Sequence, residues 1–571
     1  MALVVVMVTV ILVSLAAYGF NHQMTDAYRA SRVQTDRTQA RLAAWSGIEV
    51  AAALLERPRA NRLADAGGES FPFLQPVGDS PLGGASVGGA AEGGATPFRQ
   101  GEEPAWSFAI VSPASVGVAA GGPDGFTGPA SFTGPASSSV GLGEGAAVPW
   151  RPGWVNESAK IHVGTLREQE RRFPGHARRA LSNLPGASPD QVDSFLRSVG
   201  IVSAGGSTAG SSGGLGGSGV TRRSPLADVA ERRFTLLWFG GDWDHNYRID
   251  PLERALWGRV SGQSEVAGTG PPPAWRDYLS FDSGERNVNR NGRPRILLNG
   301  GDLPALHRQL LQIWPQPWAD FVILARQYGL SQSGWAPPLN GSGNSAGVPA
   351  SRPGGQVRSS AVGGGVASSD AAAAAPDLSR PASFRLETPF DLVDASVRIE
   401  SQGETPVVVP SPFRSATDPT GNYLDSLADD VTVDANPITI GRIDLRTAPR
   451  EVLLGVPGMS EEQADRILQA RGSPAPLATA RSTAAWLVRE QVIDLATFRR
   501  WYPWVTVGGD CFSLQVIGFR DADSPIYRCT AVLDGRTSPV VVRDFRQWQD
   551  WGRGFDIRQL TLTNAQSGDR N

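Results

Sequence analysis

The hydrophobic pattern begins with an uncharged apolar run at residues 1–20, MALVVVMVTVILVSLAAYGF. About 20 apolar residues in a helix are enough to cross the hydrocarbon core of a bilayer. Apolar positions then recur at helical spacing, and no proline interrupts them before Pro58. The pattern therefore predicts one long helix over 1–57, with a transmembrane part followed by an amphipathic stem. An ordinary signal anchor is the alternative interpretation.

Alternation of apolar and polar residues predicts strands in three places. One strand opens residues 105–122, a second segment covers 384–399, and residues 511–535 read as a hairpin. The hairpin is expected to turn between Asp521 and Pro525. These segments predict a small antiparallel sheet.

Three denser blocks share another pattern, in which a basic residue is followed by Ile, alternating apolar positions and a helix. They contain NESAKIHVGTL (156–166), RPRILLNGGDLPAL (293–306) and GRIDLRTAPREVLLGVPGMSEEQADRILQAR (441–471). In the first and third blocks a Pro–Gly turn precedes Ser188 or Ser460, which we expect to cap the next helix. The pattern predicts helix-hairpin-helix turns in these two blocks, and the second block lacks the Pro–Gly pair.

Composition separates these blocks, because many of the 67 Gly and 43 Pro lie in stretches that cannot bury a core. We therefore expect an α+β chain in which sheet pieces flank helical units. The expected order is a stem helix (1–57), a strand with a Gly-rich segment (58–150), a first helical unit (151–202), a Gly/Ser linker (203–221), an acidic loop with a second helical unit (222–332), a Gly/Ala/Pro-rich linker (333–381), a strand segment (382–440), a third helical unit (441–500), and C-terminal strands with a tail (501–571).

Charge gives no support for a nucleic-acid partner. The formal net charge is −3, and Lys160 is the single lysine. Helix-hairpin-helix turns can bind DNA backbones through their amides. Here, however, the turns are followed by acidic residues that would repel phosphate, namely Asp190, Asp193, Glu461, Glu462 and Asp465. Packing modules are the favoured interpretation.

Enzymatic motifs are missing from the sequence, and we do not expect an enzyme. The five histidines lack zinc-binding spacing, and there is no GxSxG, HExxH or phosphate loop. The histidines are His22, His162, His176, His245 and His307. Cys511 and Cys529 lie on the two arms of the predicted hairpin, where a disulfide and two half-buried thiols are both open.

An acidic loop, GDWDHNYRIDPLE, occupies residues 241–253. A twelve-residue calcium loop supplies oxygen ligands from positions one, three, five, seven, nine and twelve. Those positions hold Asp242, Asp244, Asn246, Arg248 (through its carbonyl), Asp250 (through water) and Glu253. Tyr247 departs from the pattern, because glycine normally fills the sixth position. The sequence predicts calcium here, with a solvated acidic turn as the alternative.

In order along the chain, these features resemble the K-type minor pseudopilin of type II secretion systems. The family patterns are D-E-x-x-K-I-N-x-N-T-L and I-N-x-N-T-A-P-x-x-L. The first is matched by Asn156, Glu157, Lys160, Ile161, Thr165 and Leu166, and the second by Ile443, Leu445, Thr447, Ala448, Pro449 and Leu453. The family's asparagines are replaced by His162, Gly164, Asp444 and Arg446. Val5, or an equally apolar neighbour, stands where most pilins carry a glutamate, which the K-type subunit characteristically lacks.

The resemblance implies a pilin-like scaffold, a long helix on a small sheet, with a large inserted helical domain that binds calcium in this family. It also implies a subunit of the inner membrane with its bulk in the periplasm, at the tip of a pseudopilus beside the I- and J-type minor pseudopilins. Such precursors carry a short basic leader ending in Gly, so either the leader is absent or translation begins upstream of Met1. The alternative is a signal-anchored extracytoplasmic calcium-binding scaffold with no pilus role.

Overall fold

The computed structural model describes residues 2–64, 74–76, 105–113, 150–201, 238–261, 274–331, 375–399, 406–414, 422–472, 481–558 and 560. The chain divides into two compact units. The first contains Met1–Pro294 and Asn436–Asn571, and the second, Arg295–Ala435, is inserted in its sequence. The predicted linker 203–221, most of 333–381 and most of 58–150 lie outside the described residues.

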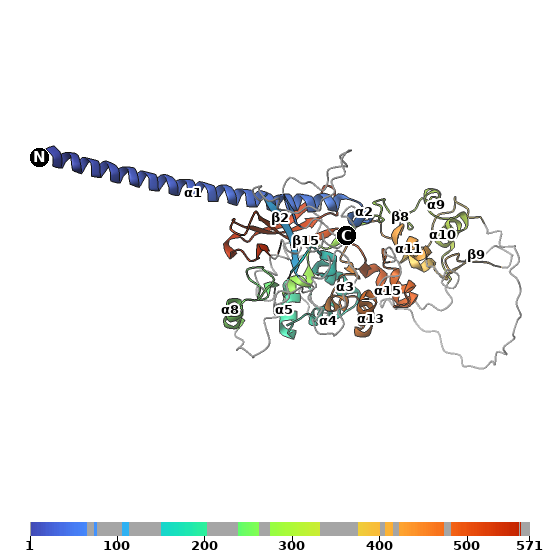
Figure 1. Ribbon diagram of the computed structural model, residues 1–571. Coiled ribbons are helices and arrows are strands. Elements are labelled where there is room, and N and C mark those ends of the chain that lie inside the picture. Colours follow the sequence, from blue (N-terminus) through green and yellow to red (C-terminus); the bar gives the residue numbers. More distant parts are fainter. Residues whose placement is uncertain are drawn as a thin grey trace, which may run out of the picture. The chain divides into compact units, whose positions relative to one another are not determined.

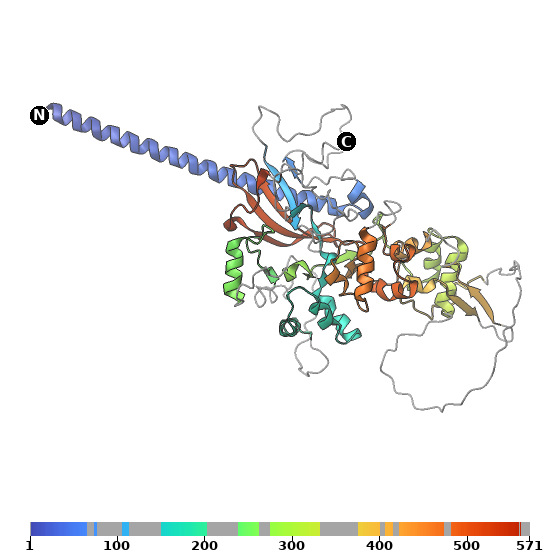
Figure 2. The ribbon, with the colours of Figure 1, turned by 60° about the horizontal axis from the view of Figure 1, so that its bottom comes forward.

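The stem helix α1 spans Ala2–Glu56 as a single helix and ends just before Pro58, as predicted. Its N-terminal part projects beyond the rest of its unit (Figures 1 and 2), and apolar side chains such as Leu3, Ile11 and Leu15 are exposed there. Among the described helices, α1 is the one long and apolar enough to cross a membrane. A single-pass anchor and a signal sequence both have this property.

A seven-stranded antiparallel sheet forms the centre of the first unit. Its main path is β1-β2-β15-β16-β17, with β3 paired to β2 and β4 paired to β15. The strands are β1 (Leu74–Pro76), β2 (Ser107–Pro113), β3 (Trp150–Pro152), β4 (Val155–Asn156), β15 (Cys511–Phe519), β16 (Tyr527–Asp534) and β17 (Val541–Gln547). The hairpin predicted over 511–535 is therefore confirmed.

The last turns of α1 pack across one face of this sheet, as Figure 2 shows for the blue helix and red strands. Because side chains alternate along a strand, Phe512, Leu514 and Val516 of β15 face the helix, and Ser513 and Gln515 face away. The helix contributes Ala40, Ala44, Ile48, Ala51, Leu54 and Leu55 to this core. The α+β class with a long helix on an antiparallel sheet is thus observed.

Both cysteines are buried free thiols on the hairpin. Cys511 pairs with Asp534 and Cys529 pairs with Val516, so the two residues lie five positions apart in register. Directly opposed residues are the ones close enough for a bridge between neighbouring strands. The structure therefore contains two buried free thiols at Cys511 and Cys529 and no disulfide between them.

Short helices form the rest of the first unit. They are α2 (Arg59–Ala64), α3 (Val163–Arg172), α4 (His176–Ser182), α5 (Pro189–Ser198), α8 (Pro251–Ser261), α12 (Arg450–Leu453), α13 (Glu461–Gly472), α14 (Trp486–Arg489) and α15 (Leu495–Trp501), with 3₁₀ turns η1 (Glu157–Ala159), η2 (Trp275–Asp277), η4 (Tyr502–Trp504) and η5 (Gln549–Trp551). Ser188 and Ser460 cap α5 and α13, since their hydroxyls accept hydrogen bonds from the amides of Gln191 and Gln463. Both predicted caps are confirmed.

Two-residue parallel strand pairs recur in all three predicted helical blocks. Ile161 pairs with Leu279, Ile296 with Val431, and Ile443 with Val505. The pairs are β5 (Ile161–His162) with β6 (Leu279–Ser280), β8 (Ile296–Leu297) with β11 (Val431–Thr432), and β13 (Ile443–Asp444) with β14 (Val505–Thr506); an antiparallel pair joins β7 (Gly284–Arg286) to β12 (Ile438–Ile440). The shared sequence pattern thus has a shared local structure.

The described residues of the second unit form helices and short strands: α9 (Leu303–Leu310), α10 (Gln316–Tyr328), α11 (Asn422–Asp429), η3 (Pro389–Leu392), β9 (Ser396–Ile399), β10 (Val407–Pro410), β8 and β11. The strand predicted over 384–399 is wrong for most of its length. Only Ser396–Ile399 is a strand, and it pairs with β10 instead of the large sheet. Pro389 lies at the start of a 3₁₀ turn capped by Thr388 and Asp391, which ends the alternation.

Candidate metal centre

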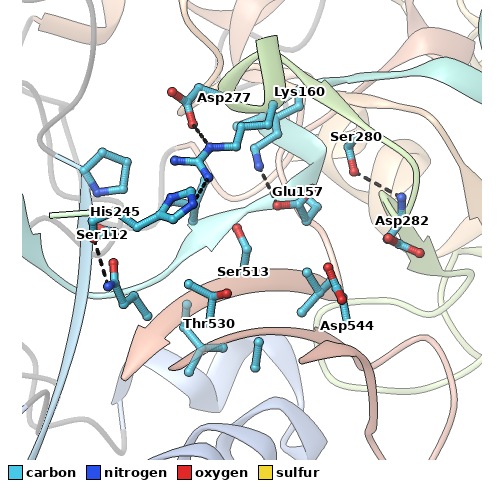
Figure 3. Close-up of a pocket in the computed structure, with 18 of the residues that line it drawn as sticks. Ser112, Glu157, Lys160, His245, Asp277, Ser280, Asp282, Ser513, Thr530 and Asp544 are labelled. Atoms are coloured by element: carbon cyan, nitrogen blue, oxygen red, sulfur yellow. Dashed lines mark hydrogen bonds and ion pairs between the residues drawn. The ribbon is translucent and has the colours of Figure 1, made fainter. Parts of the chain in front are cut away.

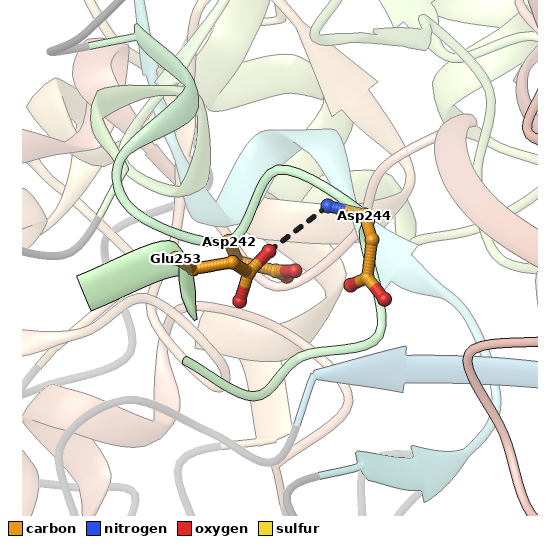
Figure 4. A group of neighbouring side chains, drawn as sticks. All are labelled: Asp242, Asp244 and Glu253. Atoms are coloured by element: carbon orange, nitrogen blue, oxygen red, sulfur yellow. Dashed lines mark hydrogen bonds between the residues drawn. The ribbon is translucent and has the colours of Figure 1, made fainter. Parts of the chain in front are cut away.

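Three carboxylates of the acidic loop converge at one point. Asp242, Asp244 and Glu253 each place an oxygen within 4.8 Å of the other two (Figure 4). Among the described residues, this is the group of three or more His, Cys, Asp or Glu side chains that has metal-binding geometry. Ca²⁺ binds oxygen ligands at about 2.3–2.6 Å, so oxygens on opposite sides of one ion stand up to about 5 Å apart. The three side chains fit one cation.

Backbone amides of the loop hold these carboxylates in place. Glu253, buried in the first turn of α8, accepts hydrogen bonds from the amides of Trp243 (2.8 Å), Asp244 (3.1 Å) and Asp250 (3.0 Å). Asp242 accepts from the amides of Asn246 (3.1 Å) and Tyr247 (3.0 Å). The loop is therefore wrapped around its acidic side chains.

Tyr247 adopts the left-handed backbone that a calcium loop requires at its sixth position. Its φ is 65°, and His245 two residues earlier has a φ of 56°. For a residue with a Cβ this conformation costs about 1–2 kcal/mol. The Tyr247 ring packs edge-on against Phe555 with centroids 6.0 Å apart, which offsets the backbone cost. The departure from glycine is thus tolerated.

The surroundings of Asp242 and Asp244 disfavour the ionised form of both carboxyl groups. Burial raises the pKa of Asp242 to about 7, against the opposing effect of the nearby Arg276 charge. Burial, followed by the charge of Glu253, also raises the pKa of Asp244. A cation in the loop would compensate both effects.

The other predicted ligands are Asn246, Arg248 and Asp250. Asn246 lies beside it, and its side-chain amide donates to Asp244 Oδ2 at 2.9 Å. Its side-chain oxygen accepts from the amide of Arg248 at 2.7 Å. Arg248 and Asp250 have exposed side chains. The structure therefore brings the carboxylates of Asp242, Asp244 and Glu253 together and places Asn246 next to them. The ligand roles of the Arg248 carbonyl and of Asp250 through water stay predictions.

The loop is anchored to the sheet by residues that the spacing analysis did not identify. Gln515 Nε2 donates to the carbonyl oxygen of His245 at 3.0 Å, and Arg528 Nη1 donates to the carbonyl oxygen of Asp244 at 3.0 Å. The centroid of the buried His245 ring also lies 3.7 Å from the centroid of the Trp548 ring. These partners come from β15, β16 and the chain after β17, hundreds of residues away, so no local signal marks them.

Three histidines, His162, His176 and His307, make contacts away from the acidic loop. His176 contacts the carbonyl oxygen of Gly455 at 3.1 Å, and His307 contacts Asp320 at 2.7 Å. Burial lowers the pKa of His162 to about 4, so this ring is neutral at physiological pH.

In comparisons with known proteins, no family model, curated protein or solved structure matches the chain.

Proposed function

We propose that this protein is a minor pseudopilin of a type II secretion system, similar to the K-type subunit, located at the tip of the pseudopilus. The observation that carries the proposal is the division of α1 into two parts. Its second half is buried against the sheet at Ala40, Ala44 and Ile48, and its first half leaves Leu3, Ile11 and Leu15 exposed. An apolar half-helix that no described residue of its unit covers suits a bilayer and, after extraction, a bundle of neighbouring stems.

The two segments that resemble the family patterns support the proposal by packing together. Asn156 Nδ2 donates to the buried Asp444 Oδ2 at 3.0 Å. Ile161 lies so close to Gly455 that an added Cβ there would stand 2.7 Å from its side chain. Residues separated by nearly 300 positions thus form one interface within the first unit.

Two replacements of the family's asparagines keep the hydrogen-bonding role that an Asn side-chain oxygen has in a turn. His162 Nδ1 accepts from the amide of Thr165 at 3.2 Å and so caps α3. Asp444 accepts from the amide of Arg446 at 3.0 Å and from the Thr447 hydroxyl at 2.7 Å. The departures are therefore chemically conservative at these two positions.

The mechanism in this proposal is mechanical and involves no catalysis. The stem packs against the stems of I- and J-type minor pseudopilins in the inner membrane, and the assembled tip leaves the membrane when the pseudopilus grows. The helix-hairpin-helix units and the inserted unit give the periplasmic part a bulk that prevents another subunit from stacking above it.

Calcium in the acidic loop belongs to the same proposal. Asp242, Asp244 and Glu253 would hold the ion, with Asn246 beside them, and the ion would fix the loop against the sheet. Its role would be structural, since the cluster is linked to the sheet through Gln515 and Arg528.

The acidic loop also favours a second candidate, a signal-anchored calcium-binding scaffold with no pilus role. A secretion assay separates the two. Deletion of the gene should leave secreted proteins trapped in the periplasm if the protein is a minor pseudopilin, and restoration of the gene should release them. Unchanged secretion would favour the scaffold. The DNA upstream of Met1 gives a second test, because a basic leader ending in Gly is expected for the pseudopilin.

A further inference from the structure

The face of the large sheet that points away from α1 borders a cavity of about 270 Å³ in the first unit, and both polar and apolar side chains line that cavity. Ser513, Thr530 and Asp544 line it from the sheet, and Glu157, Lys160 and Asp277 line the opposite wall (Figure 3). His245 and Tyr247 of the acidic loop complete one side. The cavity is thus built from distant parts of the chain.

The charges around the cavity compensate one another. The lining contains four basic residues, Arg151, Lys160, Arg276 and Arg546, and four acidic residues, Glu157, Asp277, Asp282 and Asp544. Lys160 Nζ lies 2.7 Å from Glu157 Oε1, and Arg546 Nε lies 3.3 Å from Asp544 Oδ2. Such a lining selects no net charge in a ligand, but each pair offers donors and acceptors side by side.

Uncharged polar groups, aromatic rings and aliphatic side chains occupy the rest of the lining. Gln515 is 1% exposed, and its Oε1 has no hydrogen-bond partner among the residues that the structure describes. A buried acceptor of this kind costs about 1–3 kcal/mol unless a donor reaches it. Hydroxyl groups such as those of Ser513 and Thr530 and rings such as those of Trp238 and Tyr278 line the cavity, together with aliphatic side chains such as Val111 and Val532.

We propose that this cavity binds a small, electrically neutral, polyhydroxylated molecule of about the size of one sugar ring. Cavities for drug-sized ligands begin at roughly 300 Å³, so a ligand here is smaller. Neighbouring hydroxyls of a sugar both donate and accept hydrogen bonds, and each acid–base pair in the lining offers an acceptor beside a donor. The carbon face of a sugar ring can also pack against the aromatic side chains. This binding site is independent of the pseudopilin role.

Saturation-transfer NMR on the full chain, in a detergent without sugar groups, tests the proposal. Neutral methyl glycosides should give saturation signals, and their charged analogues glucuronate and glucosamine should bind at least about ten-fold more weakly because one charge has no counterpart in a balanced lining. A disaccharide series separates a free sugar from the end of a longer glycan. The absence of signals for every neutral sugar would overturn the proposal.

Two near-isosteric variants locate the site. Thr530→Val and Asp544→Asn should each weaken glycoside binding about ten-fold, the effect of one lost hydrogen bond of the stronger kind. Asp550→Asn, an exposed carboxylate outside the cavity, is the matched control and should leave the affinity unchanged. Equal affinity in all three variants would place the binding elsewhere and refute the site.

Lys160 gives a readout that needs no variant. Because it is the single lysine, amine acylation of the chain beyond its N-terminus reports this side chain alone. Bound glycoside should slow acylation of Lys160, measured by mass spectrometry. Saturation signals with an unchanged acylation rate would contradict binding in this cavity, and if Lys160 proves unreactive the variants decide.

Discussion

Gly518 of β15 lies directly against the backbone of α1 at Ala40. A methyl group built on Gly518 would stand 2.0 Å from the Ala40 carbonyl oxygen and 2.8 Å from the amide nitrogen of Ala44. These are backbone atoms, which cannot move aside as a flexible side chain can. The stem helix and the sheet therefore meet here at a position where only glycine fits.

Replacing Gly518 by alanine should separate helix and sheet. We expect Gly518→Ala to lower the free energy of unfolding by about 3 kcal/mol, the upper part of the range for overpacked cores. Gly301→Ala is the control, because nothing lies within 4 Å of a Cβ at that position. Urea unfolding followed by tryptophan fluorescence gives both values, and equal stability of the two variants would contradict the close packing of α1 on β15.

A buried ion-pair network fixes the chain after the stem to the start of β15. Asp510 is 0% exposed, and its carboxylate lies 2.7 Å from Arg59 Nη2 and 2.9 Å from Arg62 Nη2. Asp510→Asn removes the carboxylate that faces Arg62 and one of the two that face Arg59, which keeps Glu285 at 3.5 Å, so stability should fall by about 3 kcal/mol. Asp465→Asn, which breaks an exposed pair with Arg450, should cost about 1 kcal/mol or less. A small effect at Asp510 would rule out the network as an anchor of the stem.

Acid should weaken the fold through Asp534. Burial by itself raises the pKa of this carboxyl group, but hydrogen bonds and charge from Arg536, joined by Arg543, lower the pKa to about 2. An unfolded Asp has a pKa of about 3.9, so the stabilisation is complete above that pH and is lost as the pH falls from about 4 to about 2.

The loss from Asp534 amounts to about 2 kcal/mol. Unfolding free energies measured from pH 7 to pH 2 should therefore fall less steeply in Asp534→Asn than in the wild type. Parallel curves for the two proteins would show that Asp534 does not carry this pH dependence.

Calcium should raise the melting temperature of the full chain. At a concentration of about 100 times the dissociation constant the gain is about 2.7 kcal/mol, or roughly 5 °C. Asp242→Ala with Glu253→Ala should abolish the shift, because two of the three converging carboxylates are lost. Glu168→Ala with Asp523→Ala, two exposed acidic residues outside the loop, should keep it. A shift that survives the first pair would place the ion elsewhere.

Local signals in the sequence predicted the local structure well. Pro58 correctly marked the end of α1, and Ser188 correctly marked the start of α5, because helix breaking and capping depend on neighbouring residues. Long-range pairing gave no such signal. β2 lies between β1 and β15, although about 400 residues separate it from β15. The division of the chain into two units likewise depends on contacts that spacing does not encode.

At the candidate sites too, the sequence predicted what neighbouring residues determine and missed what distant residues contribute. The three carboxylates of the acidic loop lie within twelve residues, so their spacing predicted their convergence. The left-handed Tyr247 was a weak point of that pattern, and its support by Phe555 comes from the far end of the chain. Gln515, Arg528 and the cavity around Lys160 were not predicted, because the fold assembles them from separate segments.

The central claim is that the stem and sheet form a minor pseudopilin, and co-purification with candidate I- and J-type pseudopilins tests it most directly. A chain shortened to begin at Pro58 is unsuitable, because it lacks Ala44, Ile48 and Leu55 of the α1–sheet core. A chain of residues 30–571 keeps that core and omits the apolar run. It should co-elute with both partners as a defined complex, and Gly518→Ala should weaken that complex more than Gly301→Ala does. Repeated failure of the well-folded 30–571 chain to bind either partner would contradict the account.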